Sequence, residues 1–483
     1  MSKITKGSGA AAAPLPYAVI GAGPSGLAAT RALTRRGIAV SGYELNADVG
    51  GLWDIDGPRS TMYESAHLIS SKTTTQFSEM PMGDDVADYP SHRELKKYFH
   101  AYADRFGLRE HYRFETEVTR VEPHPDGGWV VWSRSLRAST GGEGEAWTGG
   151  DGEASTGGAS GSEIGGDGER TERVAGVIIA NGTLSEPNIP LLKGDFDGEI
   201  FHTSAYKSAT VFAGKRVLII GAGNSGCDIA VDAVHHAESV DMSVRRGYYF
   251  VPKYLFGKPA DTLNQGKPLP PRIKQAIDSR VLKLFTGDPV KLGFPKPGYK
   301  IYESHPIVNS LILHHLGHGD LSIRPDVDHV DGSTVFFRGG GSGSGDGQSR
   351  DVTSRDYDTI VLATGYTLHY PFIDPALLQW NGWSPQLYLN IFSPQRDDLF
   401  VMGMVEASGL GWQGRYEQAE LIASYLEAKT ERPADAAAFT AKTRGPLPDL
   451  TGGYHYLGLE RMSYYVNKDA YRTAVRAAIE ELS

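Results

Sequence analysis

Residues 17–26 read YAVIGAGPSG, and this stretch indicates the fold of the N-terminal part of the chain. Its four apolar residues suit a buried strand. The glycine-rich turn then opens a helix-forming segment, LAATRALTRR, which ends at Gly37. A second strand, predicted over 39–43, ends at Glu44. Strand, turn, helix and strand together predict a βαβ unit of the Rossmann type.

The same pattern returns 200 residues later, in the stretch RVLIIGAGNSG over residues 216–226. Here too an apolar strand precedes the glycine turn, and a helical segment, CDIAVDAVHH, follows it. The next predicted strand, over 240–244, ends at Arg245 and Arg246 instead of a carboxylate. The sequence therefore predicts two βαβ units that are well separated in the chain.

Both turns have the spacing GxGxxG, in which each glycine has its own task. The first permits a tight turn, the second lets a pyrophosphate approach the backbone, and the third lets helix and strand pack closely. Backbone N–H groups at the start of the helix then face the phosphates. Two dinucleotide sites are predicted, with ordinary turns that bind nothing as the alternative. The predicted contacts are Gly21, Gly23, Pro24, Ser25 and Gly26 in the first turn, and Gly221, Gly223, Asn224, Ser225 and Gly226 in the second.

The residues that end the second strands distinguish the two ligands by charge. Glu44 follows Gly26 by 18 residues and can accept hydrogen bonds from a ribose 2′-OH, so the first unit suits FAD or NAD. Arg245 and Arg246 offer guanidinium donors for a 2′-phosphate, so the second unit suits NADPH rather than NADH. The alternative is that these arginines only coat the surface. The chemistry predicted is that of a flavin reduced by NADPH.

The composition is that of a folded globular protein. Of 483 residues, 40% are hydrophobic and 22% charged. There are 48 Lys and Arg against 58 Asp and Glu, and this net charge of −10 gives no general attraction to nucleic acid or anionic lipid. The N-terminus lacks the apolar core of a signal peptide, and no run of 18 apolar residues occurs. A cytoplasmic protein without a membrane partner is expected.

Cysteine and histidine usage argues against a metal or disulfide framework. Cys227 is the only cysteine, which excludes an internal disulfide, a CxxC redox pair and a thiolate zinc cluster. The histidines at 314, 315 and 318 lack a further ligand at a suitable spacing, and solvated histidines at a helix end are the better interpretation. No metal site is predicted.

Two glycine-rich stretches interrupt the chain, over 140–170 and 339–350. These stretches contain too few apolar residues to compensate for the conformational entropy that they would lose on ordering, so flexible surface loops are expected. Each lies between two strand-like segments and is predicted to be an enlarged hairpin connection.

Several motifs resemble those of the flavin-containing monooxygenases. Residues 196–207, FDGEIFHTSAYK, match the FxGxxxHxxx(Y/F)K signature of that family. Similar too are GGLW at 50–53, LATGY at 362–366 and LFVMG at 399–403, and the resemblance extends from Tyr17 to Arg476. The Baeyer–Villiger relatives have Trp at the position of Tyr206 and Pro or Asp at that of Lys207. The chain therefore resembles the branch that oxidises nitrogen and sulfur.

The resemblance implies an α/β fold with two Rossmann-like dinucleotide-binding domains, the NADPH domain being inserted into the FAD domain. The crossovers would lie at 180–182 and 362–365. The expected division is 1–185 for the first part of the FAD domain, 186–330 for the NADPH domain, and 331–483 for the second part of the FAD domain. Relatives are often dimers, which implies a homodimer.

The activity implied is that of an NADPH-dependent flavoprotein monooxygenase. NADPH would reduce FAD, and the reduced flavin would combine with molecular oxygen to a C(4a)-peroxide. A small-molecule substrate, an amine or a sulfide, would attack the distal oxygen. The alternatives are an NADPH reductase or oxidase that releases hydrogen peroxide, a Baeyer–Villiger-type oxygenase, and a non-enzymatic nucleotide sensor.

The resemblance also implies further site residues. Near the flavin, the family has an Asn in a TNxSK-like segment; here 67–72 reads HLISSK, which puts Ile69 at the Asn position. His67, Ser70 and Ser71 are the polar residues expected beside it. A helix over 416–426 is expected to aim its N-terminus at the flavin pyrimidine. His202 is expected either to fix the linker or to contact a cofactor. The remaining expected contacts are Gly51, Leu52, Trp53, Val118, Ala180 and Gln413 for FAD, and Tyr206, Thr364, Gly365 and Tyr366 for NADPH.

Overall fold

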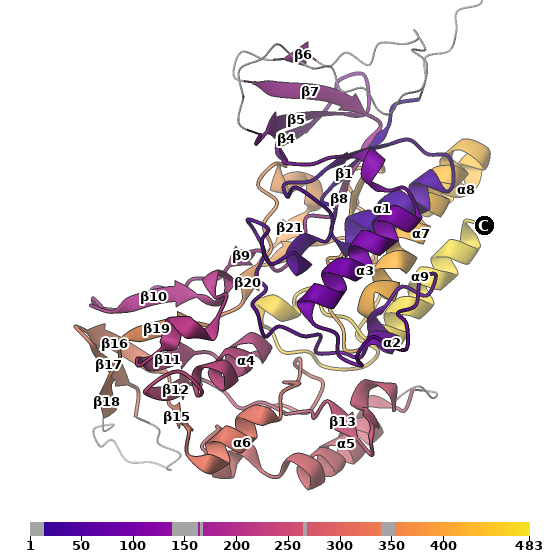
Figure 1. Cartoon of the computed structure of the whole chain (residues 1–483). Helices are drawn as coiled ribbons and strands as arrows, with labels where there is room; N and C mark the ends of the chain where they lie inside the picture. The colour runs from indigo at the N-terminus through magenta and orange to yellow at the C-terminus, as the bar shows by residue number, and fades with distance from the viewer. Residues whose placement is uncertain (1–13, 138–162, 165–167, 264–267, 340–352) are drawn as a thin grey trace, which may run out of the picture.

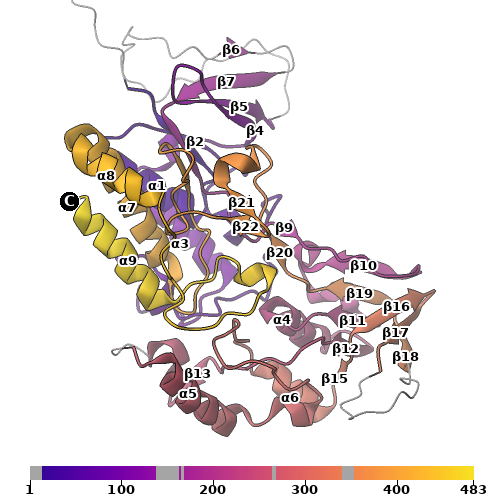
Figure 2. The same ribbon diagram turned by 180° about the vertical axis from the view of Figure 1, so that it is seen from behind.

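The computed structural model describes residues 14–137, 163–164, 168–263, 268–339 and 353–483 (Figure 1). The fold is built around two parallel sheets, each containing one of the two glycine turns. Figures 1 and 2 show the two sheets in separate parts of the molecule, connected by a narrow crossing. The predicted glycine-rich loops fall largely outside the described residues.

The first sheet has the order β23-β8-β1-β2-β3, with every neighbouring pair parallel. Its central strand carries the first glycine turn at its carboxyl end. Because the sheet is covered on both faces, its inner strands β1 and β8 and the edge strand β23 carry no charged or strongly polar side chain. The strands are β1 (Tyr17–Ile20), β2 (Val40–Tyr43), β3 (Tyr112–Arg113), β8 (Gly176–Ile179) and β23 (Leu399–Val401).

The second sheet has the order β10-β19-β11-β12-β15 and is again parallel throughout. It confirms the second predicted βαβ unit. The strands are β10 (Glu199–His202), β11 (Arg216–Ile220), β12 (Ser239–Ser243), β15 (Leu321–Arg324) and β19 (Thr359–Leu362).

The long helices divide between the two sheets (Figure 1). With the first sheet, α7 packs against α1, α8 and α9 to form the largest apolar core. With the second sheet, α4 packs against α6. The bounds are α1 (Pro24–Thr34), α2 (Lys72–Thr75), α3 (His92–Arg105), α4 (Asn224–Ala233), α5 (Pro271–Thr286), α6 (Leu311–His318), α7 (Gly411–Glu431), α8 (Pro433–Thr443) and α9 (Lys468–Glu481).

Antiparallel hairpins flank each glycine-rich stretch, as predicted. Strand β5 pairs antiparallel with β7 across the first stretch, and β17 with β18 across the second. The antiparallel strands are β4 (Thr116–Pro123), β5 (Trp129–Ser135), β6 (Glu163–Ile164) and β7 (Glu169–Val174), then β16 (Val327–Asp331), β17 (Thr334–Phe337) and β18 (Thr353–Asp356), and the short hairpins β13 (Tyr254–Leu255) with β14 (Lys258–Pro259) and β21 (Trp380–Asn381) with β22 (Ser384–Pro385).

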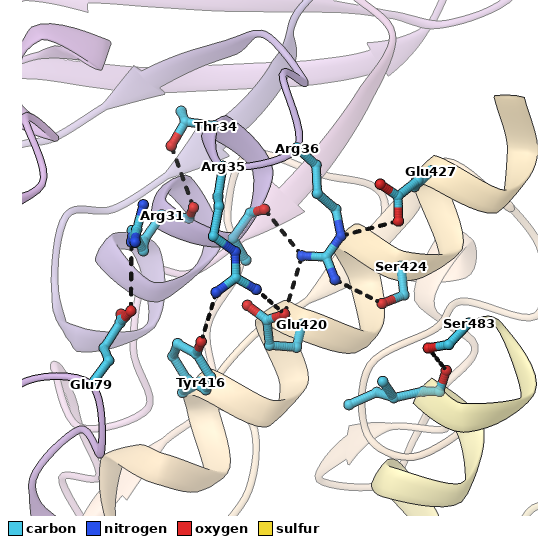
Figure 3. Close-up of polar contacts among 12 residues, drawn as sticks. Arg31, Thr34, Arg35, Arg36, Glu79, Tyr416, Glu420, Ser424, Glu427 and Ser483 are labelled. Atoms are coloured by element: carbon cyan, nitrogen blue, oxygen red, sulfur yellow. Dashed lines mark hydrogen bonds and ion pairs between the residues drawn. The ribbon is translucent and has the colours of Figure 1, made fainter. Parts of the chain in front are cut away.

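Arginines at the C-terminal end of α1 fasten this helix to α7 (Figure 3). Arg35 donates to Glu420 Oε2 at 2.5 Å, and Arg36 donates to the same oxygen at 3.1 Å. Arg36 also donates to Glu427 at 3.3 Å and to Ser424 at 3.1 Å. The Glu420 side chain is only 12% exposed, so its ion pairs are less screened than those on an open surface. This cluster holds α1, and with it the first glycine turn, in place.

Two short strands connect the sheets. Strand β9 (Glu186–Pro187) leads out of the first unit and pairs antiparallel with β20 (Tyr366–Thr367), which leads back. The second change of sheet therefore comes after Leu362, because β19 lies between β10 and β11. Residues 359–362 are thus hydrogen-bonded into the second sheet, although they follow the expected boundary at residue 330. The division of the chain into FAD and NADPH domains stays a prediction.

Candidate functional site: two glycine turns at the sheet edges

The first glycine turn leaves no room for side chains at two of its glycines. Gly21 has φ +107°, and a Cβ built on it would lie 2.6 Å from the carbonyl oxygen of Ala180. A Cβ on Gly26 would lie 1.8 Å from the Gly21 oxygen. These contacts confirm the tight turn and the close helix–strand packing that the spacing predicted.

The N-terminus of α1 beside this turn is open for an anion. Helix α1 begins with Pro24 and has Gly23 as its N-cap residue, with no side chain capping its backbone N–H groups. Across from it lies Gly51, at φ +59°, whose Cβ would come 3.0 Å from the Gly23 α-carbon. Two glycines facing each other leave the backbone accessible where the predicted pyrophosphate would bind.

Glu44 braces the turn from the end of β2. Its carboxylate accepts hydrogen bonds from the backbone N–H of Ala22 at 2.5 Å and of Asn46 at 2.8 Å. Burial raises the pKa of Glu44, while these two hydrogen bonds act in the opposite direction. Each carboxylate oxygen has a second lone pair, so the predicted contact with a ribose hydroxyl stays available.

The second glycine turn repeats this geometry. Gly221 has φ +108° and its Cβ would lie 2.4 Å from the carbonyl oxygen of Ala363, which follows β19 as Ala180 follows β8. A Cβ on Gly226 would lie 2.3 Å from the Gly221 oxygen. At Gly223, in contrast, a Cβ would meet no atom within 4 Å. Packing does not require a glycine there, whereas the approach of a phosphate does.

The two arginines after β12 carry unneutralised charge. Arg245 is exposed, and Arg246 is half-buried with its guanidinium 5.5 Å from the centre of the Tyr248 ring. Within the part of the chain that the structure describes, neither arginine forms an ion pair. Free guanidinium groups beside a glycine turn suit an additional phosphate, although they coat the surface as well.

Three further residues predicted to contact NADPH at the second turn differ in their surroundings. Asn224 accepts a hydrogen bond from the Val308 backbone at 2.8 Å, and Ser225 stays half-buried beside it. Tyr206 is fully buried, and its hydroxyl donates to Asp232 at 2.9 Å. The structure thus places Tyr206 in the apolar core of the second unit, where its hydroxyl contacts α4.

His202 fixes the linker, which was one of the two roles expected for it. Its Nε2 lies 3.0 Å from the carbonyl oxygen of Gly365, and its Nδ1 accepts from the Ser204 backbone at 3.1 Å. Both ring nitrogens are therefore engaged. Thr364 donates to the Asn188 carbonyl at 2.6 Å, and the Tyr366 ring lies edge-on to His202 at 5.2 Å. The predicted NADPH contacts Thr364, Gly365 and Tyr366 thus lie in the crossing between the two sheets.

Several predicted flavin residues meet at the N-terminus of α7. The backbone at Gly411 packs so closely on α2 that a Cβ would lie 2.3 Å from the Thr74 oxygen. Gln413 accepts a hydrogen bond from the Ser78 backbone at 3.0 Å, and Trp412 packs edge-on against Trp53 at 6.1 Å. The helix begins at Gly411, not at 416 as predicted, so Trp412 and Gln413 belong to its first turn.

The segment with the unusual Ile69 is held by its own polar network. Ser70 shares a hydrogen bond with Thr75 at 2.7 Å. The Ser71 backbone donates to Asp261 at 2.7 Å. His67 is exposed, and its Nδ1 lies 2.8 Å from the Ser65 carbonyl oxygen. These contacts give structural roles to the polar residues next to Ile69.

The other predicted flavin contacts are apolar or backbone positions. Val118 lies in β4 and packs into the core beneath the first sheet. Ala180 presents its carbonyl oxygen to Gly21, as described above. Leu52 and Gly51 belong to a short 3₁₀ turn over Gly51–Trp53 that follows the second strand.

A group of ionisable residues beside the carboxyl end of β23 was not predicted from the sequence. Glu406 lies 3.6 Å from Arg461, and His305 Nδ1 lies 3.2 Å from the Tyr465 hydroxyl. Burial lowers the pKa of His305 to about 4 and also lowers that of Arg415. Ligands of such α/β folds bind at carboxyl ends of strands, so the position of Glu406 shortly after the apolar segment LFVMG at 399–403 was the available signal.

A cleft of about 1050 Å³ lies apart from both glycine turns, between α3 and the linker. Its lining includes His92, Lys97 and Lys207. Lys207 donates to the Ser60 carbonyl at 2.8 Å and to that of Met62 at 3.2 Å, so it ties the linker to the first unit. None of the residues predicted to bind a cofactor lines this cleft.

A family model described as "Flavin-binding monooxygenase-like" matches residues 16–135 and 160–439. The chain belongs to this family. It is a flavin-dependent monooxygenase, and therefore an oxidoreductase, as the motifs predicted. The curated relatives include flavin-containing monooxygenase 3 of Oryctolagus cuniculus, 26% identical over 96% of this chain and 82% of the relative. Flavin-containing monooxygenase 5 of Homo sapiens is 27% identical over 81% of this chain and 69% of that protein.

Solved structures of flavin-dependent monooxygenases share the fold. Cyclohexanone monooxygenase from Rhodococcus sp. Phi1, bound to NADP⁺, has a TM-score of 0.65 and 19% identity, covering 98% of both chains. The S-allyl-L-cysteine S-oxygenase from Allium sativum has a TM-score of 0.61 and 18% identity, covering 97% of this chain and 89% of that one. These likenesses confirm the predicted α/β fold with two Rossmann-like sheets.

Two further expectations concern membranes and metals. No helix in the described ranges is both long and apolar enough to span a bilayer. Within those same ranges, no cluster of three or more His, Cys, Asp or Glu is arranged to hold a metal ion. The cytoplasmic location and the homodimer stay predictions.

Proposed function

We propose that this monooxygenase binds FAD at the first glycine turn and NADPH at the second, and oxygenates a soft nucleophile, an amine nitrogen or a sulfide. The observation that carries the proposal is the pair of matched turns with opposite charge beside them. Glu44 stands at the end of β2, whereas Arg245 and Arg246 follow β12. Bound NADPH would supply hydride to the flavin, which passes electrons to oxygen.

The residues present fit two dinucleotides. Both helices that follow the turns start at a glycine N-cap without a side-chain cap, so their first N–H groups are free for phosphates. Gly23 and Gly223 leave the backbone open at the point of approach. The open space at Gly223 has no packing explanation, and it is the sharpest support for a ligand at the second turn.

We further propose that the nicotinamide-binding unit extends from about residue 188 to 363, where the chain returns to the first unit. This range follows the pairing of β9 with β20 and the position of β19 in the second sheet. The remaining residues on either side would form the FAD-binding unit.

The choice of a soft nucleophile rests on the linker motif and on relatives. Tyr206 and Lys207 end the motif as in the nitrogen- and sulfur-oxidising branch. One relative, 27% identical over 81% of this chain, is named dimethylaniline monooxygenase [N-oxide-forming] 2, from Cavia porcellus. The fold does not discriminate, because cyclohexanone monooxygenase and the garlic S-oxygenase are both similar to it.

A second candidate function is an NADPH oxidase that releases hydrogen peroxide. It is favoured by Ile69, whose side chain has no donor for the hydrogen bond that the family's Asn would make. The neighbouring polar groups are engaged elsewhere: Ser70 bonds Thr75, and His67 faces solvent.

The coupling ratio between product and NADPH tests both candidates. Purified holoenzyme is incubated with NADPH, oxygen and a panel of tertiary amines and sulfides, while NADPH, oxygenated product and hydrogen peroxide are quantified. A product-to-NADPH ratio near one for any member supports the monooxygenase. A ratio near zero with stoichiometric peroxide for the whole panel contradicts it.

The variant Ile69→Asn examines the second candidate directly. If the missing amide causes peroxide release, this variant raises the ratio of oxygenated product to consumed NADPH. The control Ile69→Leu, whose apolar side chain is similar in shape to Asn, leaves that ratio unchanged. Equal coupling in both variants would show that the position has no part in retaining the oxygen chemistry.

A further inference from the structure

Helix α5 has an apolar face that nothing in the described chain covers. Its inner face is anchored by Gln275, which donates to the Ile301 carbonyl at 2.9 Å, and by the buried Leu282. On the outer face, Ile273 is 51%, Ile277 46% and Leu284 83% exposed. At about 100° per residue these three side chains fall within roughly 40° of one another and opposite the inner face. We call them the α5 stripe.

A short hairpin extends the α5 stripe with aromatic rings. Phe256, at the tip between β13 and β14, is 75% exposed, and its ring packs edge-on against Phe285 at 5.1 Å. Its backbone is left-handed, with φ +52°, a conformation that turns of this kind normally give to Asn or Gly. A large apolar residue in a strained turn that exposes it has no folding benefit, which points to an external contact.

The charge around the α5 stripe differs from that of the chain as a whole. The described residues 254–263 and 268–292 contain six Lys and Arg and three Asp, a local balance of +3 in a protein of −10. All three aspartates are already engaged: Asp261 accepts from Ser71, Asp278 from Tyr302 at 2.6 Å, and Asp288 from the Val290 backbone.

Lys274 and Lys283 of α5 pair with Asp278 and Asp288, whereas the two arginines beside the α5 stripe remain available. Arg280 lies within the stripe and donates only to the Ala276 carbonyl of its own helix, at 3.1 Å. Arg272 is exposed at the edge. Neither forms an ion pair with any residue that the structure describes. Their long side chains can reach sideways to anionic groups while the stripe enters an apolar phase.

We propose that the α5 stripe and the hairpin tip at Phe256 dock this enzyme onto the surface of an anionic phospholipid bilayer. Helix α5 would lie in the plane of the headgroups, with the stripe among the upper acyl chains and the arginines on lipid phosphates. Figures 1 and 2 show α5 and β13 at the outer edge of the molecule, far from the first sheet, where a flat surface can reach them.

Charge favours lipid over a second copy of this chain. In a two-fold symmetric contact the patch faces a copy of itself, so its free positive charges, Arg280 and Arg272 among them, would face a surface of the same charge without a nearby free carboxylate. An anionic bilayer offers both an apolar phase and negative charge. The overall charge of −10 acts against distant attraction, but only charges within about a Debye length of the surface contribute.

Vesicle co-sedimentation of the purified, flavin-loaded enzyme tests the proposal. The probes are vesicles of phosphatidylcholine alone and of phosphatidylcholine with 40% phosphatidylglycerol, each at low and high salt. We expect about tenfold stronger partitioning to the anionic vesicles, weakened by salt. Equal partitioning to both vesicle types, or none to either, overturns the proposal.

The double variant Ile277→Asp/Leu284→Asp removes the apolar contact, and Leu191→Asp is the matched control. Leu191 is 95% exposed but lies outside α5, in the segment after β9. We expect the double variant to lose at least about tenfold in partitioning while the control binds as wild type. Circular dichroism and NADPH oxidation verify that both variants are folded.

Light scattering in solution gives an independent readout. If the double variant changes a dimer into a monomer and vesicle binding is unaltered, the α5 stripe is an interface between copies, and the lipid proposal is wrong. Lost vesicle binding at unchanged mass supports it.

Discussion

Replacing Gly223 with alanine separates a folding role of the second glycine turn from a binding role. Gly223 has φ −72° and ψ 177°, an extended conformation open to any residue, and its Cβ would meet no atom within 4 Å. The free protein should therefore tolerate the methyl group. We expect the thermal midpoint and FAD content of Gly223→Ala to stay within about 2 °C and 10% of wild type.

The effect on NADPH follows from the distance between phosphate and backbone. A phosphate oxygen accepts a backbone N–H at about 2.9 Å, whereas a methyl group keeps heavy atoms about 3.5 Å away. The displaced phosphate loses at least one hydrogen bond to a charged group, about 1.5–3 kcal/mol. This corresponds to a roughly ten- to hundredfold rise in the Kd for NADPH. Titration calorimetry with NADP⁺ and the steady-state KM for NADPH measure it.

The matched variant Gly226→Ala should behave in the opposite way. Its Cβ would lie 2.3 Å from the Gly221 oxygen and 2.9 Å from the Ala363 Cβ, so the helix would have to move. We expect lower folded yield and a clearly lower thermal midpoint, from steric conflict alone. The reasoning is refuted if Gly223→Ala binds NADPH within twofold of wild type, or if it unfolds like Gly226→Ala.

Two further predictions concern stability. Glu420→Gln should lower the free energy of unfolding in urea by about 1–2 kcal/mol, because Arg35 and Arg36 lose a shared, largely buried carboxylate. An unchanged free energy of unfolding would mean that the cluster of Figure 3 does not contribute to stability. The pKa of His305 is about 4 in the folded protein and 6.5 in the unfolded chain, so as the pH falls the unfolded chain takes up a proton first. The free energy of unfolding should therefore decrease between pH 6.5 and pH 4, by up to about 3 kcal/mol. His305→Gln should flatten this acid limb in denaturation curves at several pH values, whereas an unchanged limb would exclude His305 as its source.

The glycine turns were predictable because their constraints are local. Gly21 and Gly221 need a positive φ, and Gly26 and Gly226 touch the turn that precedes them by five residues, so spacing alone carries the information. The pattern of apolar runs likewise indicated both parallel sheets.

The start of α7 was missed for a physical reason. Gly411 and Gly414 are weak helix formers and suggested a turn before residue 416. In the structure, a Cβ on Gly411 would lie 2.3 Å from the Thr74 oxygen, and one on Gly414 would lie 2.4 Å from the Leu410 Cγ. Gly411 is required by packing against α2 and Gly414 by the side chain of Leu410 one turn earlier, and helix propensity registers neither contact.

Tyr206 and the charged group at Glu406 show where sequence reasoning ends. Tyr206 belongs to a linker motif, but its partner Asp232 lies on α4, and only the folded chain brings the two together. Glu406, Arg461 and His305 come from three distant segments. Contacts between segments far apart in sequence leave no local periodicity, so a single sequence does not reveal them.

The pairing of β9 with β20 has a consequence for how such a protein can arise. The Asn188 backbone donates to the Gly365 carbonyl at 2.9 Å, so everything between these residues leaves the first unit and returns to it at one spot. In topological terms the whole second unit is a loop between β8 and β23, which remain hydrogen-bonded neighbours whatever that loop contains. A single gene insertion could therefore have added a complete dinucleotide-binding unit without disturbing the strand order of its host, leaving each unit free to evolve its own charge.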